Sequence, residues 1–377
     1  MKIGILTLPL HTNFGGILQA YALQTTLERM GHNVEVLQNT TNTGNTFHSL
    51  IMPLVYAKRI ARNILSENKI PIFIERKAKR ESPIIRQHTD RFLAQYLKLR
   101  EIKHLSEINP SDYDAIVVGS DQVWRAIYFK GMWQTNISDA FLDFTKGWDI
   151  KRIAYAASFG IDDWEYSKKE TRLCADAAKI FDAISVREDS GVKLCREKLN
   201  VEATHVLDPT MLLNKEDYMT LVSAANTPES LGDMLCYILD PTPFKTSVVN
   251  KIATEQSLTP FNVNAQIDNY SLDINERIQP PVEQWLRGFH DAKYVVTDSF
   301  HACVFSIIFG KPFIAIGNAS RGMTRFTSLL RQFGLESRLI TETTPALQDD
   351  TFTFSKIKVL LNQQVQISNK FLNDNLI

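Results

Sequence analysis

The side chains best suited to acid–base chemistry follow a strand-like apolar run late in the sequence. The run Lys293–Val296 leads into Thr297-Asp298-Ser299-Phe300-His301, where a helix is expected to begin. Free backbone N–H groups at a helix N-terminus attract anions, and the Ser299 hydroxyl adds a hydrogen-bonding group. His301 can donate a proton to a leaving phosphate or to a developing carbanion. The alternative is a buried histidine that is hydrogen-bonded to the backbone.

Arginines follow two further strand-like runs. Arg187 directly follows Ala183–Val186, and Arg321 and Arg325 follow Pro312–Ile316. The planar guanidinium group binds carboxylates and phosphates with two parallel hydrogen bonds. These arginines are therefore candidates for holding a small anionic donor. The alternatives are an ion pair between Arg187 and its neighbour Glu188, and ordinary solvation of the other two.

An earlier segment is suited to a sugar. The strand-like run Ala115–Val118 is followed by Gly119-Ser120-Asp121-Gln122-Val123-Trp124. Asp121 and Gln122 can bond hydroxyl groups, and Trp124 can stack on a pyranose face. The alternative is that Ser120 or Asp121 caps a helix while Trp124 joins the core.

A glycine pair near the N-terminus is the remaining candidate for ligand contact. Asn13, Gly15 and Gly16 lie in an expected turn ahead of a helix over Ile17–Met30. Glycines permit positive φ and close backbone approach, and the helix start favours an anion or a sugar hydroxyl. The segment matches neither common nucleotide-binding glycine motif. A tight turn without a ligand is the alternative, and His11 beside it reads as structural or solvated.

The elements that must position these residues indicate two α/β halves. Residues 2–37 read as strand, turn, helix and strand, which is the opening of a doubly wound parallel sheet. Residues 39–110 are polar, read as helices and show no strand signal, and a second α/β half starts near Asp233. We therefore expect two Rossmann-like domains facing a cleft, with an acceptor-side domain at 1–215, a helical insertion at about 45–110, a donor-side domain at 216–345 and a helical tail at 346–377.

Composition excludes several classes of protein. The 377 residues include 42 Lys and Arg and 42 Asp and Glu, so the formal net charge is zero and a general nucleic-acid binder is not expected. No apolar stretch has the length of a membrane span, and the short apolar start does not resemble a signal peptide. Four scattered cysteines favour neither disulfides nor a metal site, so we expect a cytoplasmic protein without a metal.

Taken jointly and in order, the motifs resemble those of the polysaccharide pyruvyl transferase family from Ile3 to about Leu330. They are Asn13–Gln24, Gly119–Trp124, Ser185–Glu188, Asp208-Pro209, Thr297–His301 and Gly310–Phe313. The resemblance implies a fold similar to GT-B glycosyltransferases. It also implies transfer of pyruvate from phosphoenolpyruvate to a sugar, with a cyclic ketal formed and phosphate released. Some members carry an arginine two residues before the histidine, where this chain has Ser299; Arg321 or Arg325 would then supply the charge.

We expect phosphoenolpyruvate as donor substrate, no cofactor, and a sugar or lipid-linked oligosaccharide as acceptor. Arg187 and Arg321 would hold the donor, His301 or a nearby acid would protonate its methylene carbon, and Asp121 would deprotonate the sugar hydroxyl. A lipid-linked acceptor would bring the protein to the inner face of a membrane, where basic residues of the insertion would help; a solvated helix face is the alternative. Two other functions remain open: a GT-B glycosyltransferase that uses a nucleotide sugar, and a non-catalytic glycan-binding protein of a capsule-assembly complex.

Overall fold

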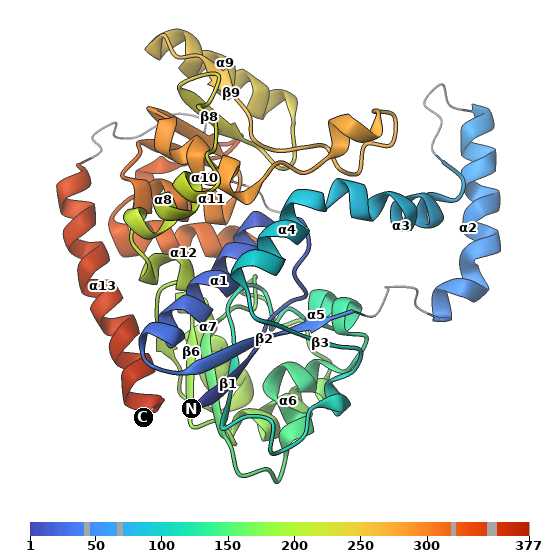
Figure 1. Cartoon of the computed structure of the whole chain (residues 1–377), viewed down its shortest axis with the longest axis vertical. Coiled ribbons are helices and arrows are strands. Elements are labelled where there is room, and N and C mark those ends of the chain that lie inside the picture. The colour runs from blue at the N-terminus through green and yellow to red at the C-terminus, as the bar shows by residue number, and fades with distance from the viewer. Residues whose placement is uncertain (41–45, 66–70, 318–321, 345–352, 377) are drawn as a thin grey trace.

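Two parallel β-sheets, each covered by helices, form the frame of the molecule (Figure 1). The structure is a computed structural model that describes residues 1–40, 46–65, 71–317, 322–344 and 353–376. The two predicted Rossmann-like domains are confirmed. The strands are β1 Lys2–Leu6, β2 Asn33–Asn39, β3 Leu99–Ile102, β4 Ala115–Val118, β5 Lys151–Ala157, β6 Ala183–Val186, β7 Thr204–His205, β8 Met234–Tyr237, β9 Pro260–Phe261, β10 Tyr294–Thr297, β11 Phe313–Ile316 and β12 Leu339–Ile340.

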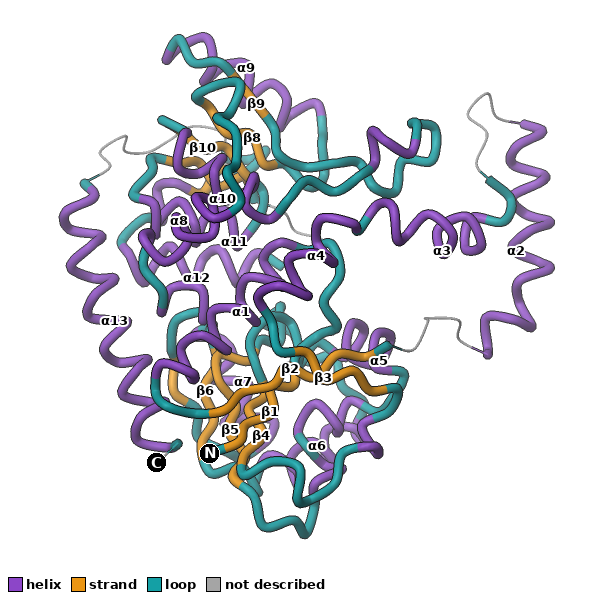
Figure 2. The backbone as a smooth tube through the Cα atoms, viewed as in Figure 1, coloured by secondary structure: helices purple, strands orange, loops and turns teal. Residues whose placement is uncertain are grey.

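The helices connect these strands in the alternating order that parallel sheets require (Figure 2). They are α1 Phe14–Arg29, α2 Thr46–Leu65, α3 Ile74–Ile85, α4 Gln87–Tyr96, α5 Ala126–Trp133, α6 Lys168–Ala178, α7 Asp189–Leu194, α8 Lys215–Ala224, α9 Pro243–Gln256, α10 Val282–Asp291, α11 Phe300–Phe309, α12 Met323–Phe333 and α13 Phe354–Asn375.

The N-terminal sheet has the strand order β3-β2-β1-β4-β5-β6-β7. Its central strands are apolar at nearly every position because helices cover both faces. Within β4, Val117 belongs to the core on the α1 side, whereas Ile116 and Val118 belong to the core that includes Phe129 and Cys174 of α5 and α6. All three side chains are fully buried.

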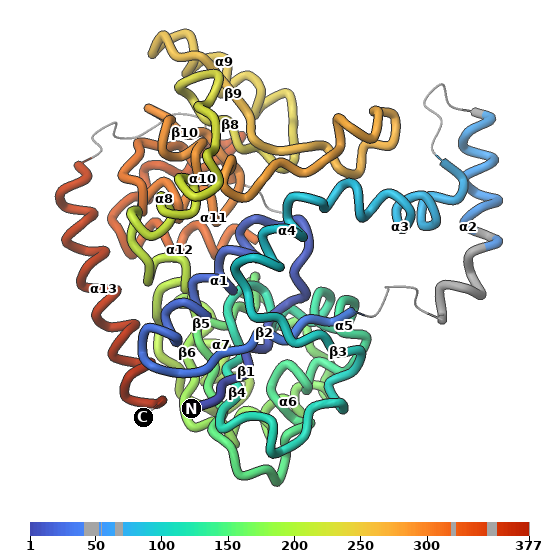
Figure 3. Tube along the Cα trace, in the orientation of Figure 1, coloured from blue at the N-terminus to red at the C-terminus, as the bar shows by residue number. Residues whose placement is uncertain are grey.

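One strand of this sheet corrects the prediction of a purely helical insertion. β3 lies inside residues 39–110 and pairs with β2, with Val36 opposite Leu99 and Asn39 opposite Ile102. Three of its four residues are partly or fully exposed because β3 is the edge strand. It therefore lacks the apolar run that reveals a central strand. The helices α2, α3 and α4 of the insertion are confirmed as helices, and Figure 3 shows α2 and α3 extending away from the sheets.

The C-terminal sheet has the order β12-β11-β10-β8-β9, with β10 at its centre. β10 pairs in parallel with β8 through Val296 and Cys236, and with β11 through Val296 and Ile314. α11 follows β10 after two residues and is buried along its whole length. The position after β10 is thus the central carboxyl end of this sheet, where ligands bind in doubly wound folds.

α13 crosses from the C-terminal domain to the N-terminal one (Figure 1). Its Ser368 hydroxyl oxygen accepts a hydrogen bond from the Leu207 backbone N–H at 3.0 Å, and the Phe371 ring lies 6.2 Å from that of Tyr155. The predicted boundary at residue 215 lies between the last strand of one sheet and the first strand of the other. Within the described residues, no helix has the length and apolar character needed to cross a bilayer.

Candidate active site at the domain junction

The histidine that the sequence singled out lies where the two domains meet. His301 occupies the first turn of α11, and its Nε2 atom lies 3.6 Å from Asp208 Oδ2 of the N-terminal domain. The side chain is 8% exposed and that of Asp208 1% exposed. A histidine of one domain therefore faces a buried carboxylate of the other.

Gly15 makes this approach possible. A Cβ atom at Gly15 would lie 2.0 Å from His301 Nδ1, which is far inside van der Waals contact. The sequence predicted Gly15 and Gly16 in a turn, but both belong to the first turn of α1, and neither has a positive φ. Close packing of the imidazole against α1, rather than backbone freedom, accounts for glycine at position 15.

Asp208 is the most densely bonded carboxylate of the junction. It caps the short 3-10 helix Pro209–Leu212 and accepts hydrogen bonds from the Thr210 N–H and hydroxyl, at 3.0 and 2.7 Å. Its Oδ2 atom accepts from Arg187 Nη1 at 2.6 Å and from the Ser120 hydroxyl at 3.0 Å. Burial opposes the charge, but His301, Arg187 and Thr210 together hold the pKa of Asp208 well below its ordinary value.

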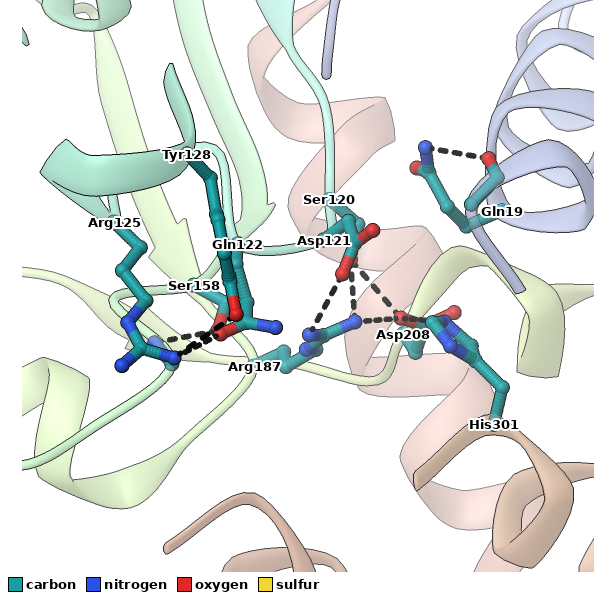
Figure 4. A network of polar contacts seen from close by, with 12 residues as sticks. Gln19, Ser120, Asp121, Gln122, Arg125, Tyr128, Ser158, Arg187, Asp208 and His301 are labelled. Atoms are coloured by element: carbon teal, nitrogen blue, oxygen red, sulfur yellow. Dashed lines mark hydrogen bonds and ion pairs between the residues drawn. The ribbon is translucent and has the colours of Figure 1, made fainter. Parts of the chain in front are cut away.

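Arg187 lies at the centre of this network, as Figure 4 shows. Besides Asp208, its guanidinium contacts Asp121 Oδ1 at 3.4 Å and Glu188 Oε1 at 3.1 Å. Burial alone would lower the pKa of Arg187, but these three carboxylates outweigh it and raise that pKa. The centre of the Phe300 ring lies 4.4 Å from the guanidinium carbon of Arg187, and the Arg187 side chain is 1% exposed. The nitrogens of Arg187, one of the predicted donor ligands, thus bind carboxylates in this structure.

Asp121 adopts a backbone conformation that is unusual for a residue other than glycine. Its φ is +67°, and its backbone oxygen accepts hydrogen bonds from the Val123 and Ser158 N–H groups. Such strained positions cluster at functional sites. The carboxylate points to the start of α1, because a Cβ at Gly16 would lie 3.6 Å from Asp121 Oδ2 and 3.3 Å from the Asn13 amide nitrogen. The structure therefore brings Asp121, Asn13 and Gly16 together, as the sequence predicted for the acceptor side.

Arg325 and Ser299 place positive charge and a hydroxyl near the start of α11. Arg325 is 6% exposed, and its guanidinium carbon lies 5.7 Å from the centre of the Phe300 ring. Burial, with a second contribution from Arg187, lowers the pKa of Arg325 to about 10. Ser299 is the N-cap residue of α11, and its side chain forms no capping hydrogen bond. Arg321, the third predicted donor ligand, lies outside the described residues.

The acceptor role expected of Trp124 is wrong. Trp124 has no exposed surface; its ring stacks on Phe141 at 4.5 Å, and its Nε1–H donates to the Ala140 backbone oxygen at 3.0 Å. The alternative that Trp124 joins the core is the correct one. Gln122 is half-buried, and its Oε1 atom accepts from Arg125 Nη1 at 3.2 Å. Gly160 makes room for this amide, since a Cβ there would lie 2.2 Å from the same oxygen.

Sequence reasoning did not assign a role to Asp208, Ser158 or Gly322, although all three build the junction. The buried Ser158 hydroxyl donates to Glu188 Oε1 at 2.6 Å, and the same oxygen accepts from Arg187 Nε at 3.1 Å. Gly322 has a φ of +92°, and a Cβ there would lie 2.1 Å from the Gly160 backbone oxygen. The Asp208-Pro209 pair was a motif, but β7 before it has two residues and no recognisable strand pattern.

The described residues contain no group of three His, Cys, Asp or Glu side chains arranged to hold a metal ion. What the junction offers is a histidine at a helix N-terminus, two buried arginines and three buried carboxylates. The carboxylates can hold or accept protons, and the arginines and α11 N–H groups can offset a developing negative charge. Every charged side chain of this set is less than a tenth exposed, so the junction is closed around them.

Several known proteins are similar to this chain. One of the similar solved structures is UDP-GlcNAc 2-epimerase from Neisseria meningitidis bound to UDP-GlcNAc. It shares 10% identity and a TM-score of 0.48 over 100% of this chain and 99% of that one. Another is Arabidopsis thaliana UGT89C1 complexed with quercetin, at 13% identity and a TM-score of 0.44, over 98% of this chain and 92% of that one. A third is the E. coli ADP-heptose lps heptosyltransferase II, at 10% identity and a TM-score of 0.36, over 97% of this chain and 99% of that one.

A search of curated protein sequences finds no match to the chain. The sequence profile of one family, described as polysaccharide pyruvyl transferase, matches residues 13–320. That span contains Asn13, Asp121, Asp208 and His301, and it covers most of both domains. The chain therefore belongs to the polysaccharide pyruvyl transferase family.

Proposed function

We propose that this protein transfers pyruvate from phosphoenolpyruvate to two hydroxyl groups of a sugar in a surface polysaccharide precursor. The observation that carries the proposal is the placement of His301. It lies at the N-terminus of α11 and 3.6 Å from the carboxylate of Asp208, and the buried cation Arg325 lies near the ring of the preceding residue, Phe300. Phosphoenolpyruvate is an anion, so protonating it requires an acid that stands next to an anion-binding group such as a helix N-terminus.

The donor phosphate is best served by α11 and Arg325. The first N–H groups of a helix lack intrahelical partners, and the Ser299 hydroxyl stands beside them. Arg325 is a buried cation whose pKa is lowered by that burial, and a guanidinium group can bind phosphate oxygens with two parallel hydrogen bonds. We infer that the two domains move apart to admit the donor, because the charged side chains of the junction are nearly inaccessible.

In the proposed reaction, His301 gives a proton to the methylene carbon, and positive character develops at C2. A sugar hydroxyl attacks C2 and loses its proton to Asp121, which lies beside Asn13 and Gly16. The C2–O bond to phosphate then breaks, and a second hydroxyl closes the ketal. Of the two hydroxyl protons, one replaces the proton taken from His301 and the other leaves with phosphate, so atoms and charge balance.

Asp208 and Arg187 serve as positioning residues in this mechanism. Asp208 orients His301 from across the junction, and Arg187 ties Asp208 to Asp121 and Glu188. Asp121 on the acceptor side and His301 on the donor side are thereby linked through one guanidinium. The network keeps acid and base at a set separation, which is the condition for concerted positioning.

The decisive experiment incubates the protein with phosphoenolpyruvate and extracted glycan precursors. We expect inorganic phosphate in solution and a glycan whose mass has increased by one ketal-linked pyruvate. Release of a nucleoside diphosphate from nucleotide sugars, without phosphate release from phosphoenolpyruvate, would instead establish a glycosyltransferase. Saturable glycan binding with all substrates unchanged would establish a non-catalytic protein.

His301→Ala tests the role of the histidine. General acid catalysis contributes roughly 10²- to 10⁴-fold, so we expect turnover to fall by that order while glycan binding persists. His104→Ala is the matched control, because His104 is an exposed histidine outside the junction. Near-wild-type turnover of the His301 variant would remove the proposed acid from the mechanism.

A further inference from the structure

Two helices of the insertion carry apolar side chains into solvent. α2 and α3 extend from the body of the molecule beyond α4 (Figure 1). Ile60 and Ile64 of α2 are 45% and 78% exposed and lie four residues apart, so they share one helix face. Phe73 and Ile84, at the two ends of α3, are 49% and 45% exposed. We call the described residues 53–64 and 71–86 the arm.

The arm is also strongly basic in a protein that is neutral overall. It contains eight Lys and Arg residues and two Glu residues, a net charge of +6, so the remainder of the chain is correspondingly acidic. Both glutamates are paired: Glu75 with Arg59 at 2.6 Å, and Glu81 with Arg277 at 2.7 Å. The exposed cations are Lys58, Arg62, Arg76, Lys79 and Arg80.

The two helices hold each other. Arg59 Nη1 donates to the Ile72 backbone oxygen at 2.9 Å, and the rings of Tyr56 and Phe73 meet edge to face at 4.9 Å. The charge of Arg59 is therefore paired within the arm, whereas Ile60 and Ile64 remain exposed to solvent. Exposed apolar side chains interleaved with cations characterise a surface that inserts into the headgroup region of an anionic bilayer. A soluble polyanion would engage the cations but leave the isoleucines in water.

We propose that the arm binds anionic phospholipid bilayers, with Ile60 and Ile64 inserted and the exposed cations against the headgroups. The base of the arm adjoins the proposed acceptor side, since Arg86 Nη1 lies 3.0 Å from His11 Nδ1. Gln279 bridges the same two segments: its backbone N–H donates to the Ile85 oxygen at 2.9 Å, and its side chain donates to the Thr12 backbone oxygen at 3.1 Å. The inference rests on the arm alone and stands whether or not the proposed reaction is correct.

Vesicle flotation with the full chain tests the proposal. We expect association with vesicles of phosphatidylcholine containing phosphatidylglycerol, and little with phosphatidylcholine alone. Raising the salt from roughly 0.1 M to roughly 1 M shortens the Debye length from about 10 Å to about 3 Å and should release the protein. Equal binding to both lipids, or no binding to either, overturns the proposal.

Paired variants locate the contact. Ile60→Glu with Ile64→Glu should lower the vesicle-bound fraction at least about tenfold, and Lys79→Gln with Arg80→Gln should lower it in the same direction. Val359→Glu with Ile367→Glu is the matched control, because these α13 residues are 58% and 47% exposed. Thermal melting should be unchanged in all three. An equal loss in the control, or a wild-type dimer that the isoleucine variant converts to monomer, overturns the proposal in favour of another surface or of a second copy as occupant.

Discussion

At the scale of single residues, the junction is a network of buried charges whose members depend on one another. Arg187 contacts Asp121, Glu188 and Asp208, and Asp208 in turn faces His301. Removing one partner of such a network leaves an uncompensated buried charge, which is costly. The network therefore specifies one arrangement of acid and base instead of merely adding stability.

Gly15→Ala is predicted to disrupt this arrangement sterically. The new Cβ would lie 2.0 Å from His301 Nδ1, so the imidazole or the whole of α11 must shift. A misplacement of about 1 Å costs roughly 10²-fold in rate, and overpacking costs about 1–3 kcal/mol of stability. Phosphate release from phosphoenolpyruvate and urea-induced unfolding measure the two effects.

The control for this prediction is Gly131→Ala in α5. A Cβ there meets nothing within 4 Å, so activity should be unchanged. Wild-type activity in the Gly15 variant would mean that His301 need not lie against α1 for catalysis.

The sequence predicted which residues lie at the junction better than it predicted their contacts. His301, Ser299 and Asp121 gather there because each lies just beyond the carboxyl end of a strand, β4 in one sheet and β10 in the other. The surroundings of Trp124 and Arg187 could not be predicted, because their partners come from distant segments. Phe141 covers the Trp124 ring, and Asp208 binds Arg187. No local pattern announces such contacts.

At the scale of elements, apolar runs predicted the central strands and their order of appearance. β4 and β6 begin and end where the sequence indicated, and α11 begins within the segment expected to start a helix. β3 was missed because an edge strand needs only one buried face, and β7 because it has two residues. The helical position of Gly15 was missed because glycine lowers helix propensity, and only the imidazole packed against it explains its presence.

The turn before α1 and the α3–α4 junction are coupled through His11. Burial, with a second contribution from Arg86, lowers the pKa of His11 to about 4 from an ordinary 6.5. In the unfolded chain His11 takes up a proton at a higher pH than in the folded one, so folding is penalised as the pH falls from about 6.5 to about 4. The contribution of neutral His11 to the free energy of unfolding is fully present above about pH 6.5 and is lost progressively as the pH falls to about 4.

His11→Gln should therefore reduce the loss of unfolding free energy between about pH 7 and about pH 5, by on the order of 2 kcal/mol. Glutamine keeps an acceptor for Arg86 but cannot take the proton. Urea titrations at the two pH values measure the change, with His104→Gln as the control. Identical pH dependence in the variant and the wild type would assign the acid sensitivity to other groups.

At the scale of the whole molecule, zero net charge conceals a strong separation of charge. The arm is basic, the junction pairs its charges internally, and the remainder is acidic. Composition argues against binding of a long polyanion over the whole surface, but it could not locate this separation of charge. That requires knowing which side chains are exposed, and Glu81 is a charge that composition counts but the surface does not show.

The buried pair of Arg277 and Glu81 joins the C-terminal domain to the arm and offers a test of how the two domains are held together. Arg277 is 1% exposed and Glu81 9% exposed as side chains, and Arg277 also donates to the Ile267 backbone oxygen and lies over the Tyr270 ring. Arg277→Met would leave the glutamate without its main partner. We expect it to cost about 3–5 kcal/mol of unfolding free energy.

Replacing both residues should recover most of that loss, because two apolar side chains carry no unpaired charge. The cycle of Arg277→Met, Glu81→Met and the double variant is measured by denaturant unfolding. Arg196→Met is the control, since Arg196 pairs with Glu202 where both are more than half exposed, and such pairs contribute about 0–1 kcal/mol. If the double variant is as unstable as Arg277→Met, the packing of the guanidinium over Tyr270, and not the ion pair, holds the arm to the second domain.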